Sequence, residues 1–215
     1  MGIEGNLRQI SPSLLEIARR DLYVLNLYLH AKKTIETEEI KCLPTYLHNK
    51  NFHCDLDGVL ADDQWRIGRL DIDSDWHAIH YLLTENSSSW EKCKLPFVVT
   101  RHEIKTRLLI NAVMGGTSIE ETRGGFMDFA PVRYLTQMET QTISEALLQV
   151  SEEDFELRYN EACECNPNIY RTLWDEEFER YWYRFRCLCE YYKIATEKGR
   201  GMLLYLGCFY GVDFE

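Results

Sequence analysis

The amino-acid sequence predicts an α+β fold, a compact single domain with a small mixed sheet packed against several helices. Two observations support this prediction. Apolar residues recur at helical spacing in long segments, most regularly over 176–197. Short apolar runs typical of strands lie near both ends of the chain, over 3–10 and 202–206, and again over 132–135. We therefore expect the N-terminal and C-terminal strands to belong to the same sheet.

The first helix is predicted directly after the first strand. Ser11-Pro12 gives a hydroxyl cap followed by proline at the first helical position. The apolar residues that follow keep helical spacing and predict one amphipathic helix over 12–33. Residues 34–68 have no sustained periodicity and are rich in charge and turn-forming residues. They are interpreted as an acidic insertion within a single domain spanning 1–215.

Helix-start signals recur in the second half of the chain. Asp73 or Ser74 can cap a helix that continues to Leu83. Thr136 and the glutamate three residues later form a capping box that opens a helix ending near residue 150. Ser151 starts a further, short helix. The stripe of aromatic residues over 176–197 is expected to lie in the core.

Charge and composition limit the partners and the compartment. The net charge is -11, from 24 basic and 35 acidic residues, which repels nucleic-acid phosphates and favours a basic partner. No apolar run is long enough to span a bilayer, and the first residues do not have the layout of a signal peptide. We expect a soluble cytoplasmic protein with neither a nucleic-acid nor a membrane partner.

The cysteines give little support to a metal site. The chain contains eight cysteines, including the pairs Cys163-x-Cys165 and Cys187-x-Cys189. Zinc sites typically space their paired thiolates more widely, as C-x₂₋₄-C. Without an export signal the cysteines are expected to be free thiols, and neither a metal nor a cofactor is predicted.

One short stretch matches a catalytic motif. Asp55-Leu56-Asp57-Gly58-Val59-Leu60 spells the first motif of haloacid-dehalogenase-like phosphatases. Its nucleophile must follow a buried strand, but the four residues before Asp55 form a poor one. The acidic pair that would hold magnesium after a later strand is also missing. A phosphatase using Asp55 and Asp57 is therefore a less favoured alternative.

A second acidic pattern resembles a calcium loop. Asp71-x-Asp73-x-Asp75 begins like an EF-hand, but Trp76 stands where glycine is needed and Leu82 where a bidentate glutamate is needed. We interpret these aspartates as part of a solvated acidic face.

Several segments, in the same order along the chain, resemble the YfbM-like family (domain of unknown function 1877). These segments are "MGIEGNLRQIS", "RLDIDSDWHAIHYLLTE", "APVRYLT", "NIYRTLWDEE" and "GRGMLLYLG". The resemblance covers residues 1–30 and 69–207, and it implies that the acidic insertion over 34–68 is variable. The sequence departs from the family pattern at Ala130, where glycine is usual, and at Arg171, where proline is usual.

The resemblance implies a function as well as a fold. The family is described as a compact α+β domain, and its bacterial members occur in toxin-immunity gene neighbourhoods, where they are regarded as toxin-neutralising proteins. The chain is accordingly expected to be a non-catalytic protein-binding module, an immunity protein that neutralises a cognate toxin. A basic toxin surface would be met by the acidic set Asp55, Asp57, Asp62 and Asp63.

The enzyme alternative is a small hydrolase with a pocket around Trp76, His80, Arg133 and Tyr134. His80 could act as an acid-base group, and Arg133 precedes a helix start that could receive an anion. The competing interpretation makes His80 a core residue beside Trp76 and pairs Arg133 with a carboxylate. We favour the competing interpretation, so no catalytic residue is assigned and an enzyme is the less favoured class.

Overall fold

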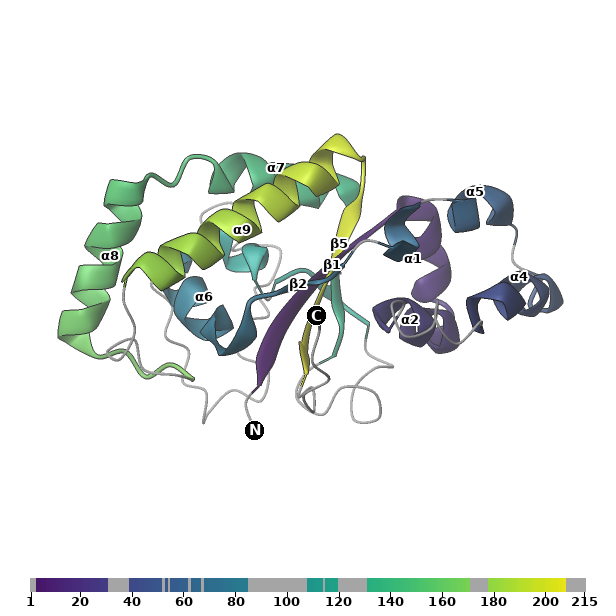
Figure 1. The fold of residues 1–215 in the computed structure, drawn as a ribbon, viewed down its shortest axis with the longest axis horizontal. Coiled ribbons are helices and arrows are strands. Elements are labelled where there is room, and N and C mark those ends of the chain that lie inside the picture. The colour runs from purple at the N-terminus through teal and green to yellow at the C-terminus, as the bar shows by residue number, and fades with distance from the viewer. Residues whose placement is uncertain are drawn as a thin grey trace.

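The fold is described from a computed structural model. The structure describes residues 3–30, 39–51, 53, 55–61, 63–66, 68–84, 108–113, 115–119, 131–170 and 178–207. These residues form a five-stranded sheet flanked by helices on both faces (Figure 1). The predicted α+β class is confirmed.

The strands of the sheet are ordered β2-β1-β5-β4-β3. Their bounds are Glu4–Ile10 for β1, Leu70–Asp71 for β2, Thr117–Ser118 for β3, Arg133–Leu135 for β4 and Gly201–Gly207 for β5. Every described strand pair is antiparallel, so the expectation of a mixed sheet was wrong in that respect. Alternating apolar residues indicate a strand but not its direction, which is why the sequence pattern did not distinguish the two cases.

The first and last strands belong to the same sheet, as expected, and they pair near its centre. β1 pairs with β5 along its whole length, from Glu4 opposite Gly207 to Ile10 opposite Gly201. Successive side chains of each strand point to opposite faces. On β5, for example, Leu204 faces one hydrophobic core and Tyr205 faces the other.

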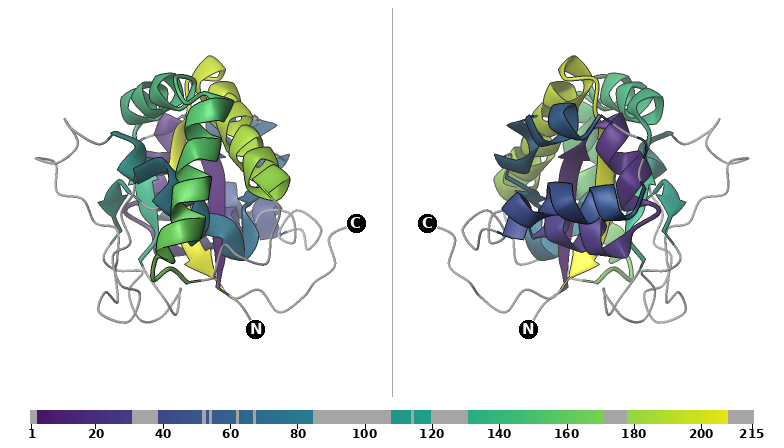
Figure 2. Two further views of the ribbon diagram at one scale, coloured as in Figure 1. Left: turned by 90° about the vertical axis from the view of Figure 1, so that its left-hand side faces the viewer. Right: turned by 90° about the vertical axis from the view of Figure 1, so that its right-hand side faces the viewer.

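Helices cover both faces of the sheet, and Figures 1 and 2 show the resulting three layers. One face is covered by α6 (Trp76–Thr84), α7 (Gln137–Leu147), α8 (Glu152–Cys165) and α9 (Phe178–Glu197). The other face carries α1 (Pro12–Ala18), α2 (Leu22–Leu29), α4 (Glu39–Asn49) and α5 (Leu56–Ala61). Short 3₁₀ turns occur at Asp63–Arg66, Asp73–Asp75 and Leu108–Ala112. None of the helices in the described ranges is long and apolar enough to cross a bilayer.

The single helix expected over 12–33 is interrupted. α1 ends at Ala18, and α2 begins at Leu22 with Asp21 as its N-cap. The Asp21 carboxylate accepts hydrogen bonds from the backbone N–H groups of Tyr23 at 2.9 Å and Val24 at 3.4 Å. An aspartate that caps the helix following it competes with continuation of the preceding helix, so the chain turns here although the apolar spacing continues.

The segment 34–68 contains more structure than its lack of periodicity suggested. α4 and α5 lie within it, and both contribute to the core on the α1 and α2 side. Its buried side chains include Leu47, Val59 and Trp65. Helices of 6 and 11 residues show too few turns for a periodic pattern to stand out.

Other predicted elements are confirmed. The capping box opens α7: the Thr136 hydroxyl accepts from the Glu139 N–H, and the Glu139 carboxylate accepts from the Thr136 N–H at 2.8 Å. α9 buries the aromatic stripe, including Tyr181 and Phe185. The helix after Ser151 is 14 residues long rather than short. The sequence also contains a short apolar segment over 95–100, which lies outside the described residues.

Candidate functional site

Trp76 and His80, two members of the predicted hydrolase pocket, lie in the core. The Trp76 indole N–H donates to the carbonyl of Ile3 at 3.0 Å. The strand beside it carries Gly5, where a Cβ atom would stand 2.4 Å from the Cβ of Trp76. Glycine at this position therefore allows α6 to pack directly against β1.

His80 is 0% exposed, one helical turn from Trp76. Burial lowers the pKa of His80 to about 3, and the neighbouring His77 adds to the lowering. A neutral imidazole enclosed in the core is not exposed to a substrate in solvent. This placement favours the core interpretation of His80 over an acid-base role.

Arg133 and Tyr134 are both buried in β4 but point to opposite faces of the sheet, because they are consecutive strand residues. The Tyr134 ring belongs to the core under α1 and α2, whereas Trp76 belongs to the core under α6 to α9. The sheet therefore separates Tyr134 from Trp76, and the four predicted pocket residues do not line one cavity.

The predicted acidic set is also divided by the structure. Asp55 and Asp57 are exposed at the start of α5, and the Asp55 carboxylate caps that helix by accepting from the Gly58 N–H at 2.9 Å. No strand precedes Asp55 within the described residues 39–51, 53 and 55–61. Asp62 lies outside the described residues.

Asp63 has a structural partner. Its carboxylate accepts from the buried Arg200 guanidinium at 2.5 Å and lies 3.6 Å from the Lys198 amine. The adjacent Gln64 side chain accepts from the Ser11 N–H at 2.7 Å. These contacts fix the end of the acidic segment to the sheet, so the charge of Asp63 is already compensated.

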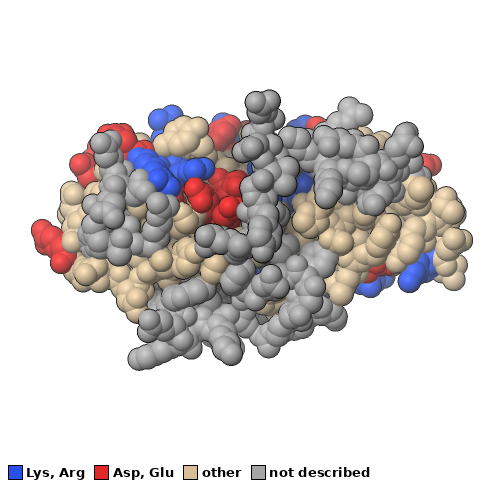
Figure 3. Space-filling view, turned by 60° about the horizontal axis from the view of Figure 1, so that its bottom comes forward, with Lys and Arg blue, Asp and Glu red and all other residues tan. Residues whose placement is uncertain are grey.

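The aspartates that resemble a calcium loop form ion pairs with α9. Arg180 contacts the buried Asp75 through two nitrogens, at 2.9 Å and 3.1 Å, and Arg184 donates to the backbone carbonyl of Asp71 at 3.0 Å. Burial raises the pKa of Asp75, and the Arg180 guanidinium partly offsets that rise. Figure 3 shows a face of the molecule where basic and acidic side chains lie side by side. The pairing makes this cluster a link between the sheet edge and α9.

Metal coordination finds no support in the described part of the chain. No group of three or more histidine, cysteine, aspartate or glutamate side chains there could hold a metal ion. The cysteines in the same ranges, among them both closely spaced pairs, are free thiols.

An exposed acidic face runs along α8. The exposed residues Glu153, Glu156, Leu157, Glu161 and Glu164 recur at intervals of one helical turn, opposite the buried Phe155 and Ala162. The one basic residue of the helix, Arg158, turns inward and donates to the carbonyl of Leu82 at 3.1 Å. The four glutamates of this stripe therefore have no cation from their own helix beside them in solvent. We call these five exposed residues the α8 face.

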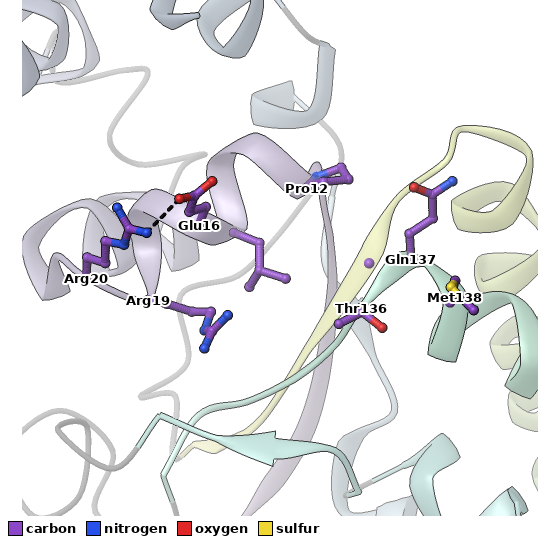
Figure 4. Close-up of a pocket in the computed structure, with 9 residues that line it drawn as sticks. Pro12, Glu16, Arg19, Arg20, Thr136, Gln137 and Met138 are labelled. Atoms are coloured by element: carbon purple, nitrogen blue, oxygen red, sulfur yellow. Dashed lines mark hydrogen bonds and ion pairs between the residues drawn. The ribbon is translucent and has the colours of Figure 1, made fainter. Parts of the chain in front are cut away.

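The structure also shows a groove that the sequence interpretation missed. It lies between α1 and the start of α7 and has a volume of about 610 Å³ (Figure 4). One wall is formed by Pro12, Leu15, Glu16, Arg19 and Arg20, the other by Thr136, Gln137 and Met138, and Gly201 completes the lining. Two features of the sequence could have indicated this groove, the arginine pair at the end of the first helix and the helix start at Thr136. Their proximity required the fold, because more than a hundred residues separate them.

Comparison with known proteins assigns this architecture to a family. A family model described as a domain of unknown function, DUF1877, matches residues 1–205. The chain belongs to this family. This DUF1877 domain is similar to the crystal structure of YfbM from Escherichia coli, a protein of unknown function, with a TM-score of 0.50. The two chains share 15% sequence identity, and the match covers 94% of this chain and 99% of that one. At this identity the likeness concerns the fold alone. No curated protein matches the chain.

Proposed function

We propose that this DUF1877 protein is a non-catalytic binding module that neutralises a basic protein, a cognate toxin, by direct contact. The observation that carries the proposal is the α8 face, where four glutamates surround an exposed Leu157 while the only arginine of the helix is turned inward. Leu157 is 58% exposed. An apolar residue ringed by charges of one sign suits a partner that presents basic side chains around an apolar contact.

The overall charge of the chain supports the same partner. A net charge of -11 creates a long-range field that accelerates association with a basic surface and disfavours polyanions. The toxin-neutralising role is the expectation drawn from the resemblance of the sequence segments to the YfbM-like family. α8 lies at one end of the molecule and α5 at the other (Figure 1). Asp55 and Asp57 are therefore a second, separate candidate surface.

The test replaces the three glutamates that lie beyond the first turn of α8, as Glu156→Gln, Glu161→Gln and Glu164→Gln. The first-turn acids are kept because they stabilise the helix N-terminus. The matched control removes three exposed charges from α7 and α9, as Glu145→Gln, Glu190→Gln and Glu197→Gln. A third variant, Asp55→Asn with Asp57→Asn, tests the surface predicted from the sequence.

A partner captured by the immobilised intact chain from its source organism is first identified, then purified and titrated against each variant. The α8 variant is expected to weaken binding at least about tenfold, since truncated interface charges commonly cost more than 1 kcal/mol. The control should bind within about twofold of the parent. Equal affinity for all variants would refute the α8 assignment, and a loss confined to the Asp55 and Asp57 variant would move the contact to α5.

A further inference from the structure

The groove between α1 and α7 differs in charge from the rest of this acidic protein. Arg19 and Arg20 both line it, with Glu16 as the acidic residue of the lining. Glu16 is engaged by Arg20 at 2.7 Å (Figure 4). Arg19 is the cation left facing the groove.

Arg19 is held in place by a ring rather than by a carboxylate. Its guanidinium carbon lies 4.6 Å from the centroid of the Tyr134 ring, a cation–π contact. No carboxylate lies within ion-pair distance of Arg19 anywhere in the described chain. In Figure 4 its side chain reaches from α1 toward the strand that leads to Thr136. Arg19 is therefore an oriented positive charge with no anionic partner among the described residues.

The opposite wall adds an apolar surface and a weak positive potential. Met138 is 78% exposed, an unusual exposure for a large apolar side chain, and Pro12 and Leu15 lie across from it in the lining. α7 is 11 residues long and points its N-terminus into the groove. The Glu139 carboxylate already occupies the N–H and hydroxyl of Thr136, so the first turn contributes only part of its usual potential.

We propose that this groove binds an acidic peptide segment of a partner protein. In this arrangement a carboxylate side chain of the segment meets the Arg19 guanidinium, and a neighbouring apolar side chain covers Met138. A volume of about 610 Å³ is in the range of pockets that enclose an extended ligand of this kind. The site is independent of the α8 face, which has the opposite charge.

The charge of the chain favours a peptide over a nucleic acid. One uncompensated guanidinium can neutralise one anionic group, whereas a nucleic acid brings a phosphate at every nucleotide against a net charge of -11. The apolar residues of the groove favour a peptide over a free inorganic anion, because phosphate gains nothing from contact with Met138.

The probes are two capped peptides, acetyl-Ala-Leu-Asp-Leu-Ala-amide and its twin with asparagine in place of aspartate. Each is titrated into the intact protein and binding is followed by NMR chemical-shift changes and calorimetry. Inorganic phosphate is titrated separately to test whether a free anion binds at the same place. We expect saturable binding of the aspartate peptide with a Kd below about 1 mM, and binding of the asparagine twin at least about tenfold weaker.

Variants locate the binding. Arg19→Gln is expected to weaken binding of the aspartate peptide at least about tenfold, and Met138→Ala is expected to weaken it about threefold. Arg186→Gln is the matched control and should stay within about twofold, because Arg186 is exposed on α9 and does not line the groove. Arg19→Lys keeps the charge but not the planar stacking on Tyr134, and should give an intermediate affinity.

Three results would overturn the proposal. The first is that binding of the aspartate peptide does not saturate at about 5 mM, well above the expected Kd. The second is that both peptides bind equally well. The third is that phosphate binds at Arg19 and the peptide does not displace it. Arg19 is exposed, so a thermal melt within a few degrees of the parent is expected for its variants and would separate lost binding from lost folding.

Discussion

The two histidines of α6 should make the stability of the protein strongly dependent on pH. Burial lowers the pKa of His77 to about 4 and of His80 to about 3, whereas both titrate near 6.5 in the unfolded chain. Between these values the unfolded state binds more protons than the folded state, so stability is lost as the pH falls. The His77 ring also accepts a hydrogen bond from the Tyr170 N–H at 2.8 Å, which protonation would remove.

The expected magnitude follows from these pKa differences. Each imidazole should cost about 2 kcal/mol of unfolding free energy between about pH 7.5 and pH 5, or about 4 kcal/mol for the pair. Such a loss is a large share of the 5–15 kcal/mol that holds a typical domain together. Burial raises the pKa values of Glu4 and Asp75, so these carboxyl groups act in the opposite sense and offset part of the loss toward the acid end.

Urea unfolding at a series of pH values from about 5 to 7.5 measures this dependence. Replacing His80 by leucine should lower the slope by up to about 1.4 kcal/mol per pH unit, the value for one proton. His48→Gln is the matched control, because His48 is exposed on α4, and it should keep the parental slope. If His80→Leu also keeps the parental slope, His80 is not a buried neutral residue and the argument against its acid-base role fails.

Substitutions at three further positions test the structural account. Gly5→Ala should lower the free energy of unfolding by about 1–3 kcal/mol, because the added Cβ would stand 2.4 Å from the Cβ of Trp76. Urea unfolding measures this change, and unchanged stability would contradict the packing of α6 against β1. Asp75→Asn should cost about 1–3 kcal/mol in the same assay, toward the low end because the Arg180 side chain is 31% exposed and can be hydrated. Asp55→Ala should lower the free energy of unfolding by about 1 kcal/mol through loss of a helix cap, and Asp55→Asn should lower it less. Magnesium-dependent hydrolysis of a phosphate ester by the parent, abolished in Asp55→Asn, would instead support the phosphatase alternative.

The parts of the fold that local chemistry determines were predictable from the sequence. The capping box at Thr136 opens α7, and the long apolar stripe of α9 is buried as its period indicates. The break at Asp21 was missed because apolar spacing continues across it, while one carboxylate starts a new helix. α5 was missed because a helix of 6 residues is too short for its period to be recognised.

The candidate site was harder to predict because burial and pairing depend on distant residues. His80 is a plausible catalytic residue by type, yet the fold encloses it in the core. Asp63 belongs to an acidic run in the sequence, but its charge is compensated by Arg200, 137 positions away. The helix start at Thr136 was considered as a place for an anion, and the structure shows that Thr136 lines the groove between α1 and α7. The cations that line its groove are Arg19 and Arg20 from α1, whereas Arg133 is buried in β4.

The central claim is that the acidic α8 face recognises a basic protein. The most direct test is the rate of association with the purified partner, measured by stopped flow at increasing sodium chloride concentration. Electrostatic steering predicts that the association rate of the parent falls steeply as salt increases, while the dissociation rate changes less. The variant with glutamine at Glu156, Glu161 and Glu164 should show a weaker salt dependence of its association rate. An association rate independent of salt, or the same salt dependence in parent and variant, would contradict the account.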